Sequence, residues 1–137
     1  YSMRGDEHWD SFFSALIPFN QSWVQNASAI IYVLSDTMTG EGENAKPSHS
    51  HSFDAGAAWM SMALQAHEMG LITHGMTGVD FDKAAEILKL PKRFRVEAAI
   101  AVGHQGEKEA LPEELQAKEQ LSGRRPIGET IYHGPVK

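Results

Sequence analysis

Cysteine is absent from the 137-residue chain, which excludes disulfides, thiolate nucleophiles and thiolate metal sites. Basic residues are scarce as well. Twelve Lys and Arg stand against eighteen Asp and Glu, for a net charge of −6, which argues against a nucleic-acid binder or a binder of anionic membranes. No apolar run reaches the roughly 18 residues that would span a bilayer, and no signal peptide is recognisable. These absences favour a cytoplasmic protein.

What the chain does contain is typical of a folded domain. Hydrophobic residues make up 42% and charged residues 22%, both ordinary proportions for a globular protein. The length is that of about one domain with a substantial core, so we predict a single domain over residues 1–137. The chain opens at Tyr1 rather than Met and is already apolar over residues 9–17. We therefore expect a processed protein or a part of a longer chain.

Apolar side chains recur at helical spacing near the start of the chain. Residues 9–17 carry Trp, Phe, Leu and Ile at positions i, i+3, i+4, i+7 and i+8, which predicts a helix. Pro18 either ends this helix or opens the next turn, and residues 23–27 are a candidate for a second short turn. Asp80 is placed to cap a further helix over residues 81–89.

Two segments have the pattern of β-strands. Residues 29–34 form an apolar, β-branched run without alternation, typical of a strand that is buried on both faces. Residues 94–102 alternate, and regular alternation puts Val96 and Ile100 on one face and Ala99 on the other. The sequence therefore predicts strands of one small sheet.

The connecting segments complete the predicted architecture. Residues 35–50 are rich in Ser, Thr, Gly, Glu and Asn and predict one long loop. Residues 112–120 begin with Pro and two acidic residues, which favours a short helix. The order of elements predicts an α+β fold with a small central sheet flanked by helices.

The strongest helical segment spans residues 52–69. Ser52 is a plausible N-cap and Gly70 a natural C-cap. Because no charged residue occurs from Ala55 to Leu64, we expect this helix to be buried on all sides.

Few motifs in the chain carry chemistry. There is no phosphate-binding loop of the GxxxxGK[ST] type, no strand-linked GxGxxG and no serine nucleophile elbow. Several histidines invite a metal reading, but no carboxylate motif with ligand spacing accompanies them, and we predict no metal. The histidines considered are His49, His51, His67, His74 and His104.

Two short stretches remain as candidate ligand contacts. The paired glycines of Gly75-Met76-Thr77-Gly78 would let the backbone approach a flat ligand closely, although the same residues are compatible with a plain connecting turn. The adjacent Arg124 and Arg125, with Ser122 nearby, suit a phosphate because a guanidinium binds it through two hydrogen bonds. A solvated basic turn is the alternative.

Taken together, these stretches resemble the nitroreductase family. HSFDAGAAWMSMALQAHEMGLITHGMTGVD is similar to the family's central helix and flavin loop, and LPEELQAKEQLSGRRPIGETIYHG is similar to its C-terminal segment. The opening, YSMRGDEHWDSFFSALIPFNQSWVQNASAIIYVLSD, resembles the part that follows the family's Gln-Pro-Trp strand. The resemblance covers essentially the whole chain and implies the C-terminal two-thirds of a nitroreductase-like domain. Part of the family's phosphate clamp belongs to the first third of the family's domain, which we expect to lie outside the residues given.

The resemblance implies an FMN-dependent oxidoreductase that uses NAD(P)H to reduce a nitroaromatic, a quinone or a similar small acceptor, with the hydride chemistry carried by the flavin. Gly75, Met76, Thr77 and Gly78 would line the isoalloxazine, with backbone N–H groups donating near N5. Many members have an acid where Thr77 stands. No catalytic side chain is required.

The phosphate of the flavin would be met by the C-terminal segment. Arg124 and Ser122 are the matching residues. Many members have a Lys where Ser122 stands, and Arg125 would compensate for the positive charge that is missing at that position. Two alternatives stay open: other flavin chemistry on the same fold, such as reductive dehalogenation or flavin fragmentation, and a non-enzymatic flavin-binding scaffold.

The resemblance also implies a homodimer with the long central helix at its interface. Of the two apolar faces of this helix, we expect the first to serve the chain's own core and the second to meet the partner. The first face is Phe53, Ala57, Met60 and Leu64, and the second is Gly56, Trp59, Ala63 and Ala66.

Overall fold

The computed structural model describes residues 1–135, which divide into a compact unit over Tyr1–Gln105 and a second unit that begins at Gly106. The first unit is built on a four-stranded antiparallel sheet of order β1-β2-β6-β5. Its strands are β1 Ser2–Met3, β2 Ala29–Asp36, β5 Ile72–Met76 and β6 Phe94–Gly103. The predicted α+β class with a small sheet is confirmed.

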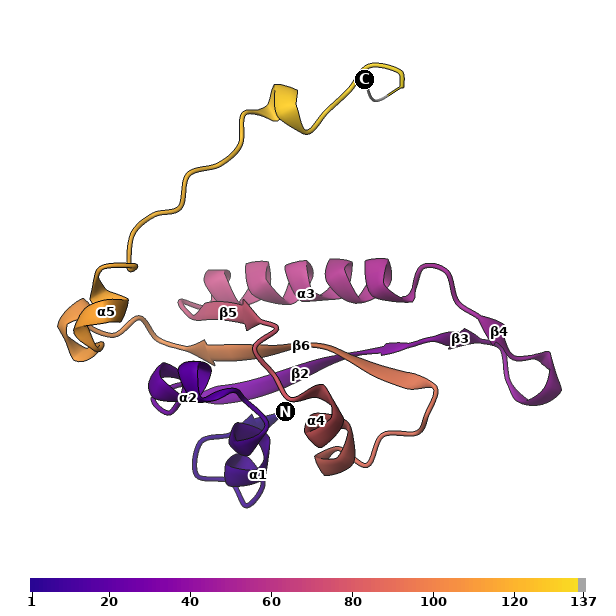
Figure 1. Ribbon diagram of the computed structural model, residues 1–137, viewed down its shortest axis with the longest axis horizontal. Helices are drawn as coiled ribbons and strands as arrows, with labels where there is room; N and C mark the ends of the chain where they lie inside the picture. The colour runs from indigo at the N-terminus through magenta and orange to yellow at the C-terminus, as the bar shows by residue number, and fades with distance from the viewer. Residues whose placement is uncertain (136–137) are drawn as a thin grey trace. The chain divides into compact units, whose positions relative to one another are not determined.

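Helices cover both faces of this sheet (Figure 1). One face carries three short helices, and the other carries the long helix α3. The short helices are α1 Trp9–Ser14, α2 Pro18–Val24 and α4 Phe81–Ile87, and α3 spans His51–Glu68. Asp80 caps α4 as predicted, because its side chain accepts a hydrogen bond from the Lys83 N–H at 3.0 Å.

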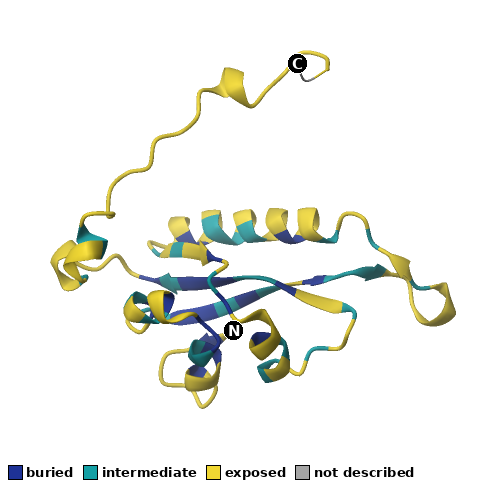
Figure 2. Cartoon of the chain, in the orientation of Figure 1, coloured by how far each residue is buried: buried dark blue, intermediate teal, exposed yellow. Residues whose placement is uncertain are grey.

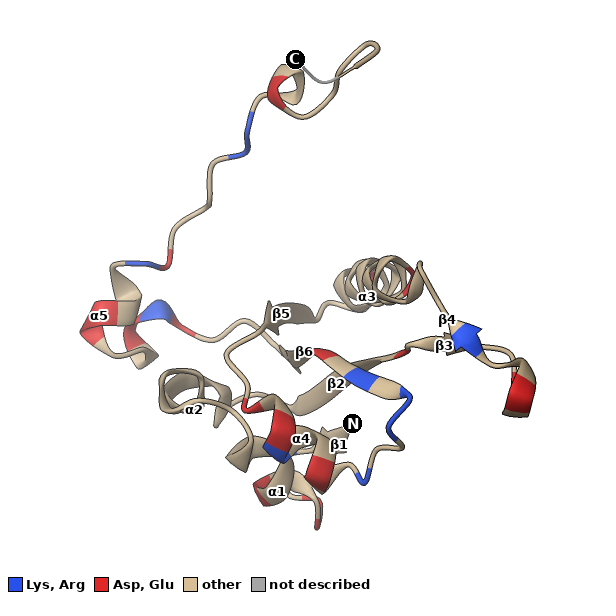
Figure 3. Ribbon diagram, turned by 45° about the vertical axis from the view of Figure 1, so that its right-hand side comes forward, with Lys and Arg blue, Asp and Glu red and all other residues tan. Residues whose placement is uncertain are grey.

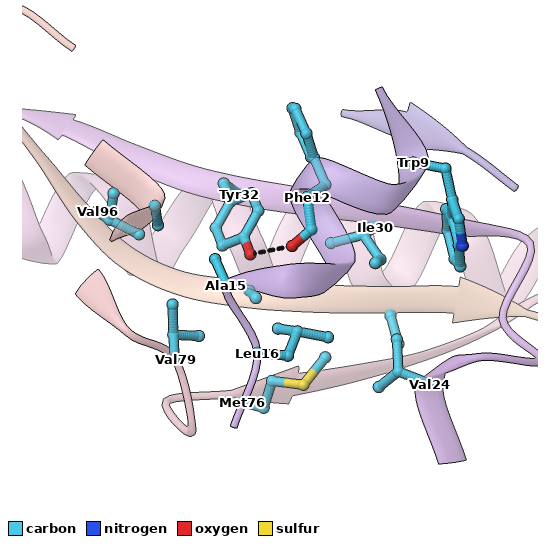
Figure 4. Packing of buried hydrophobic residues seen from close by; sticks show 13 residues of the cluster. Trp9, Phe12, Ala15, Leu16, Val24, Ile30, Tyr32, Met76, Val79 and Val96 are labelled. Atoms are coloured by element: carbon cyan, nitrogen blue, oxygen red, sulfur yellow. Dashed lines mark hydrogen bonds between the residues drawn. The ribbon is translucent and has the colours of Figure 1, made fainter. Parts of the chain in front are cut away.

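The main core lies between the sheet and the three short helices (Figure 4). Figure 2 shows the buried residues gathered along β2 and β6 and on the helix faces that meet them. Tyr32 of β2 brings its hydroxyl into this core and donates to the Phe12 carbonyl oxygen at 2.8 Å. Burial raises the pKa of Tyr32 to about 12, so the phenol stays neutral and holds α1 against the sheet.

The segments before and after β2 differ from the sequence prediction. The helix expected over residues 9–17 ends at Ser14. Pro18 opens α2, which confirms one of its two predicted roles, and α2 already covers residues 18–24 where a short turn over residues 23–27 was expected. The loop expected over residues 35–50 is a two-stranded hairpin, because β2 runs to Asp36 and short strands follow. They are β3 Met38–Thr39 and β4 Lys46–Pro47, with a 3-10 turn at Gly42–Asn44 between them.

A bulge in β6 overturns the predicted alternation of its faces. Val33 pairs with Ala98 and Leu34 with Val96, so Glu97 is the extra residue. Val96 therefore shares the main core with Ala99, whereas regular alternation would have put Val96 with Ile100.

The long helix α3 is less buried than its composition suggests, and the expectation of burial on all sides was wrong for the single chain. Only Ala55 and Ala66 are buried along its 18 residues. The two faces are also the reverse of the prediction. Trp59 packs toward the sheet, while the face expected in the core is open, with Phe53 80% and Leu64 57% exposed.

The helix ends close to where it was expected. Ser50, two residues before the predicted Ser52, is the N-cap, and its hydroxyl donates to Asp54 at 2.8 Å. Gly70 follows the C-cap with a φ of +75°, a left-handed conformation that favours glycine.

The second unit contains only short elements. They are a 3-10 turn at Lys108–Ala110, helix α5 over Glu113–Gln116 and a 3-10 turn at Ile127–Glu129. The helix predicted over residues 112–120 is thus one turn long. Across residues 1–135, no helix combines the length and the apolarity that a membrane span requires.

Candidate functional site

The four residues predicted to line a flat ligand end the edge strand β5 and begin the link to α4. Gly75 and Met76 are the last residues of β5, and Thr77 and Gly78 follow it. Strand β5 is at one end of the strand order, and within residues 1–135 no other strand pairs with its outer edge. The segment is therefore half strand and half link, with backbone groups along an open edge.

Two tryptophans lie against opposite faces of β5. A Cβ on Gly75 would stand 3.2 Å from Cζ2 of Trp59, and 3.5 Å from the Ile100 side chain. On the other face, Trp23 of α2 contacts the ring of His74, with ring centroids 4.7 Å apart and planes tilted by 55°. Glycine at position 75 thus makes room for Trp59. Because both faces of β5 are covered here, a ligand can approach this segment only along the outer edge of the strand.

The link after β5 is held from the α2 side. The Gly78 carbonyl accepts from the Ile17 N–H at 3.1 Å and from Nδ2 of Asn20 at 3.0 Å. A Cβ on Gly78 would lie 2.8 Å from Cδ1 of Ile17 and still closer to the Asn20 amide. The second glycine is therefore also required by close packing inside the chain.

The same link presents backbone donors. The Val79 N–H turns back to the Thr77 carbonyl at 2.9 Å. The N–H groups of Thr77 and Gly78 have no acceptor anywhere in residues 1–135. Thr77 is exposed and Gly78 is partly so, which makes these two N–H groups available to a ligand with acceptor atoms.

The predicted phosphate contacts lie in the second unit. Arg124 donates through Nη1 to the Ser122 carbonyl oxygen at 3.2 Å and to the Ser122 hydroxyl, so these two candidate residues lie side by side. Both Arg124 and Arg125 are exposed, and within residues 1–135 neither forms an ion pair with a carboxylate. Uncompensated guanidinium groups beside a hydroxyl suit a phosphate.

A hydrogen-bonded network at the start of α3 was missed by the sequence analysis. Its centre is Glu97, at the bulge of β6, which accepts from the Ser35 hydroxyl at 2.6 Å and from Arg95 at 2.7 Å. Ser52 of α3 donates to the same carboxylate at 3.1 Å, and His51 lies 3.4 Å away. Figure 3 shows basic and acidic residues following one another along the first half of β6.

The electrostatics of this network favour the charged carboxylate. The hydrogen bond from Arg95, followed by those from Ser35 and Ser52, outweighs desolvation and lowers the pKa of Glu97 to about 2. The carboxylate therefore ties α3 to the sheet at any physiological pH. The signal in the sequence was the pair Arg95 and Glu97 in an otherwise apolar strand. The partners of Glu97, Ser35 and Ser52, are distant in sequence, so the network could not be predicted from it.

An open hollow of about 400 Å³ lies beside the network, between the end of β2, the β3–β4 hairpin and the start of α3. Two acidic residues, Asp36 and Asp54, line the hollow. Asp36 is paired with Arg93 through two hydrogen bonds of 2.8 and 2.6 Å, which lower the pKa of that carboxyl. Within residues 1–135, no three His, Asp or Glu side chains are grouped as metal ligands.

Comparison with known proteins connects this geometry to one family. The sequence pattern of the nitroreductase family matches residues 6–104. A 15.4 kDa protein from the ask 5′ region of Mycolicibacterium smegmatis, of uncharacterised function, is 32% identical over 119 residues, which are 80% of this chain and 78% of that protein.

Solved structures give the same result. The crystal structure of an oxidoreductase containing FMN is 40% identical and has a TM-score of 0.95, over 99% of this chain and 69% of that one. A nitroreductase from Desulfovibrio desulfuricans, solved in complex with FMN, is 26% identical with a TM-score of 0.66, over 99% of this chain and 70% of that one. The chain belongs to the nitroreductase family.

Proposed function

We propose that the chain is an FMN-dependent oxidoreductase. The observation that carries this proposal is its similarity to the oxidoreductase containing FMN, at 40% identity over 99% of the chain with a TM-score of 0.95. The D. desulfuricans relative in complex with FMN supports the same cofactor. We extend the proposal to NAD(P)H as the reductant, to a nitroaromatic, quinone or similar small acceptor as the oxidant, and to a cytoplasmic protein whose residues 1–137 form one domain.

The residues present fit FMN by their chemistry. The backbone N–H groups of Thr77 and Gly78 are donors without acceptors in residues 1–135, on the open edge beside Gly75 and Met76. They would donate to acceptor atoms of the flavin ring. Arg124 and Arg125, free of carboxylates in the described chain, would bind the phosphate together with Ser122.

When bound, FMN supplies the transfer of hydride between NAD(P)H and the acceptor. The chain's own contribution is to orient the ring and to direct N–H dipoles at the place where negative charge develops on reduction. Dipoles held in position by the fold stabilise such charge without reorganising. Trp59 and Trp23 occupy the two faces of β5, so they restrict the ring's approach to the strand edge.

We also propose a homodimer, with the interface on the exposed face of α3. This face carries an apolar stripe of Phe53, Ala57, Met60 and Leu64, and three of these side chains are more than half exposed. An exposed apolar stripe of this kind is typical of an interaction surface. It replaces the opposite face, around Trp59, as the predicted contact.

Colour and turnover together test the proposed function. The purified chain, incubated with FMN and passed through a desalting column, should retain a flavin absorbance near about 450 nm. It should then oxidise NADH or NADPH when a nitroaromatic or quinone is added. Retained colour without turnover of either acceptor would favour other flavin chemistry on this fold. No retained colour would refute an FMN oxidoreductase.

A further inference from the structure

We propose that Asn20 of α2 is a positioning residue for the flavin-binding segment, holding the free N–H groups of Thr77 and Gly78 in the orientation that binds the ring. The inference rests on the proposed function, because it concerns how that site is ordered. Asn20 itself is 6% exposed and points at Gly78, so it acts through the backbone and not on a ligand.

The turn between α1 and α2 is connected to the β5–α4 link by a set of hydrogen bonds. The Ile17 N–H donates to the Gly78 carbonyl at 3.1 Å, and the Asp80 N–H donates to the Ala15 carbonyl at 2.8 Å. Leu16 forms an isolated antiparallel bridge with Val79 between these two bonds. The amide Nδ2 of Asn20 adds a second donor to the Gly78 carbonyl at 3.0 Å.

Asn20 is the side chain that restrains the most permissive point of this link. Glycine has more backbone freedom than any other residue. The peptide group between Gly78 and Val79 is held by hydrogen bonds at both its carbonyl and its N–H. The Gly78 carbonyl accepts from Ile17 and Asn20, and the Val79 N–H donates to the Thr77 carbonyl. Asn20 also fills the space that a Cβ on Gly78 would need. The same contact therefore requires glycine at position 78 and restrains the conformation of its backbone.

A rigid β5–α4 link should increase the affinity of its N–H donors for the flavin. Donors that are already fixed do not lose conformational freedom when the ligand arrives, and they favour the charged state of the ligand more strongly than mobile donors do. Removal of the Asn20 amide should therefore weaken the binding of reduced flavin more than that of oxidised flavin, because the reduced ring carries the greater negative charge. The midpoint potential of bound FMN should become more negative.

Asn20→Leu and Gln21→Leu make a matched pair for the test. Both changes remove an amide from α2 that donates to backbone carbonyls. The Gln21 amide donates to the Leu16 carbonyl at 2.8 Å and to the Phe13 carbonyl at 3.3 Å, and neither hydrogen bond involves Gly78. The two variants should lose similar thermal stability, and only Asn20→Leu should disturb the link. Asn20→Ala, which keeps the Ile17 bond and leaves room for water, serves if the leucine variant folds poorly.

Two readouts separate positioning from general destabilisation. In the apo protein, ¹⁵N order parameters at Thr77, Gly78 and Val79 should fall in Asn20→Leu and remain at wild-type values in Gln21→Leu. In the FMN complex, the ratio of reduced to oxidised dissociation constants should rise about tenfold in Asn20→Leu, a shift of about 30 mV for a two-electron couple.

The outcomes distinguish this inference from the proposed function. An Asn20→Leu protein with the order parameters and the midpoint potential of Gln21→Leu would overturn the role of Asn20 while leaving FMN binding in place. Lower order parameters with an unchanged potential would show a structural role alone and would overturn it as well. A wild-type chain that binds no FMN would instead refute the proposed function itself.

Discussion

The exposed apolar stripe of α3 gives the sharpest prediction about assembly. Leu64 lies on this stripe, and 57% of its surface is open to solvent in the single chain. We predict that Leu64→Glu dissociates a homodimer while leaving the fold of each chain intact. The residue that the sequence analysis placed at the contact, Trp59, packs against Gly75 of β5 instead, so its substitution would damage the fold rather than the interface.

The expected size of the effect follows from burial. Complete burial of a leucine side chain stabilises by about 1.5–3 kcal/mol. Slightly more than half of the Leu64 surface is available to a partner, which corresponds to roughly 1–1.5 kcal/mol per copy. A two-fold interface counts this twice, for roughly 2–3 kcal/mol. The dimer dissociation constant should rise by about 30- to 150-fold, with a further loss from burying a carboxylate.

The assay is sedimentation equilibrium over a range of protein concentrations, together with circular dichroism and a thermal melt. Gln65→Glu is the matched control, because it adds the same charge at the adjacent exposed position of α3 but lies off the stripe. It should leave the dimer unchanged. The reasoning fails if the wild-type chain is monomeric at micromolar concentration, or if Leu64→Glu and Gln65→Glu dissociate at the same concentration.

Three further predictions concern the site and the fold. Arg124→Ala should weaken FMN binding by about 1.5–3 kcal/mol, the range for a lost charged hydrogen bond; calorimetry should show the loss, while Arg4→Ala, another exposed arginine, should show none. Gly78→Ala should lower the melting temperature through overpacking of about 1–3 kcal/mol, because the new Cβ would stand 2.8 Å from Ile17; an unchanged melt would contradict the packing described. Glu97 has its pKa lowered to about 2 from a usual value near 4.5, so its charge stabilises the fold above about pH 4.5 and this contribution, about 1–3 kcal/mol, is lost as the pH falls toward 2. Glu97→Gln should lack that acid-dependent loss in urea titrations, and a variant with the wild-type pH profile would exclude the network as its source.

Local signals in the sequence were sufficient for one end each of α3 and α4 and for the two central strands, β2 and β6. Asp80 caps α4 because the cap depends on a residue and the N–H three positions later. Gly70 ends α3 for an equally local reason, its left-handed φ. The apolar runs likewise predicted β2 and β6, although both strands extend beyond the predicted ends.

Features that depend on distant contacts could not be derived in the same way. Both faces of α3 are apolar, so the face that meets the sheet depends on contacts with distant residues, among them Trp59 against Gly75 and Ser52 with Glu97. The bulge at Glu97 depends on the register with β2, and the hydrogen bond from Ser35 to Glu97 spans 62 residues. The two glycines of the candidate site were noticed, but their packing against Trp59 and Asn20 requires the structure.

Equilibrium titration of the apo chain with FMN and with riboflavin tests the central claim most directly. The tryptophans on the two faces of β5 provide a fluorescence signal close to the proposed ring site. We predict saturable binding of one FMN per chain and weaker binding of riboflavin, because riboflavin lacks the phosphate that Arg124 and Arg125 would hold. Absence of saturable FMN binding would contradict the claim that this chain is a flavin oxidoreductase, and equal affinities for the two flavins would contradict the phosphate site.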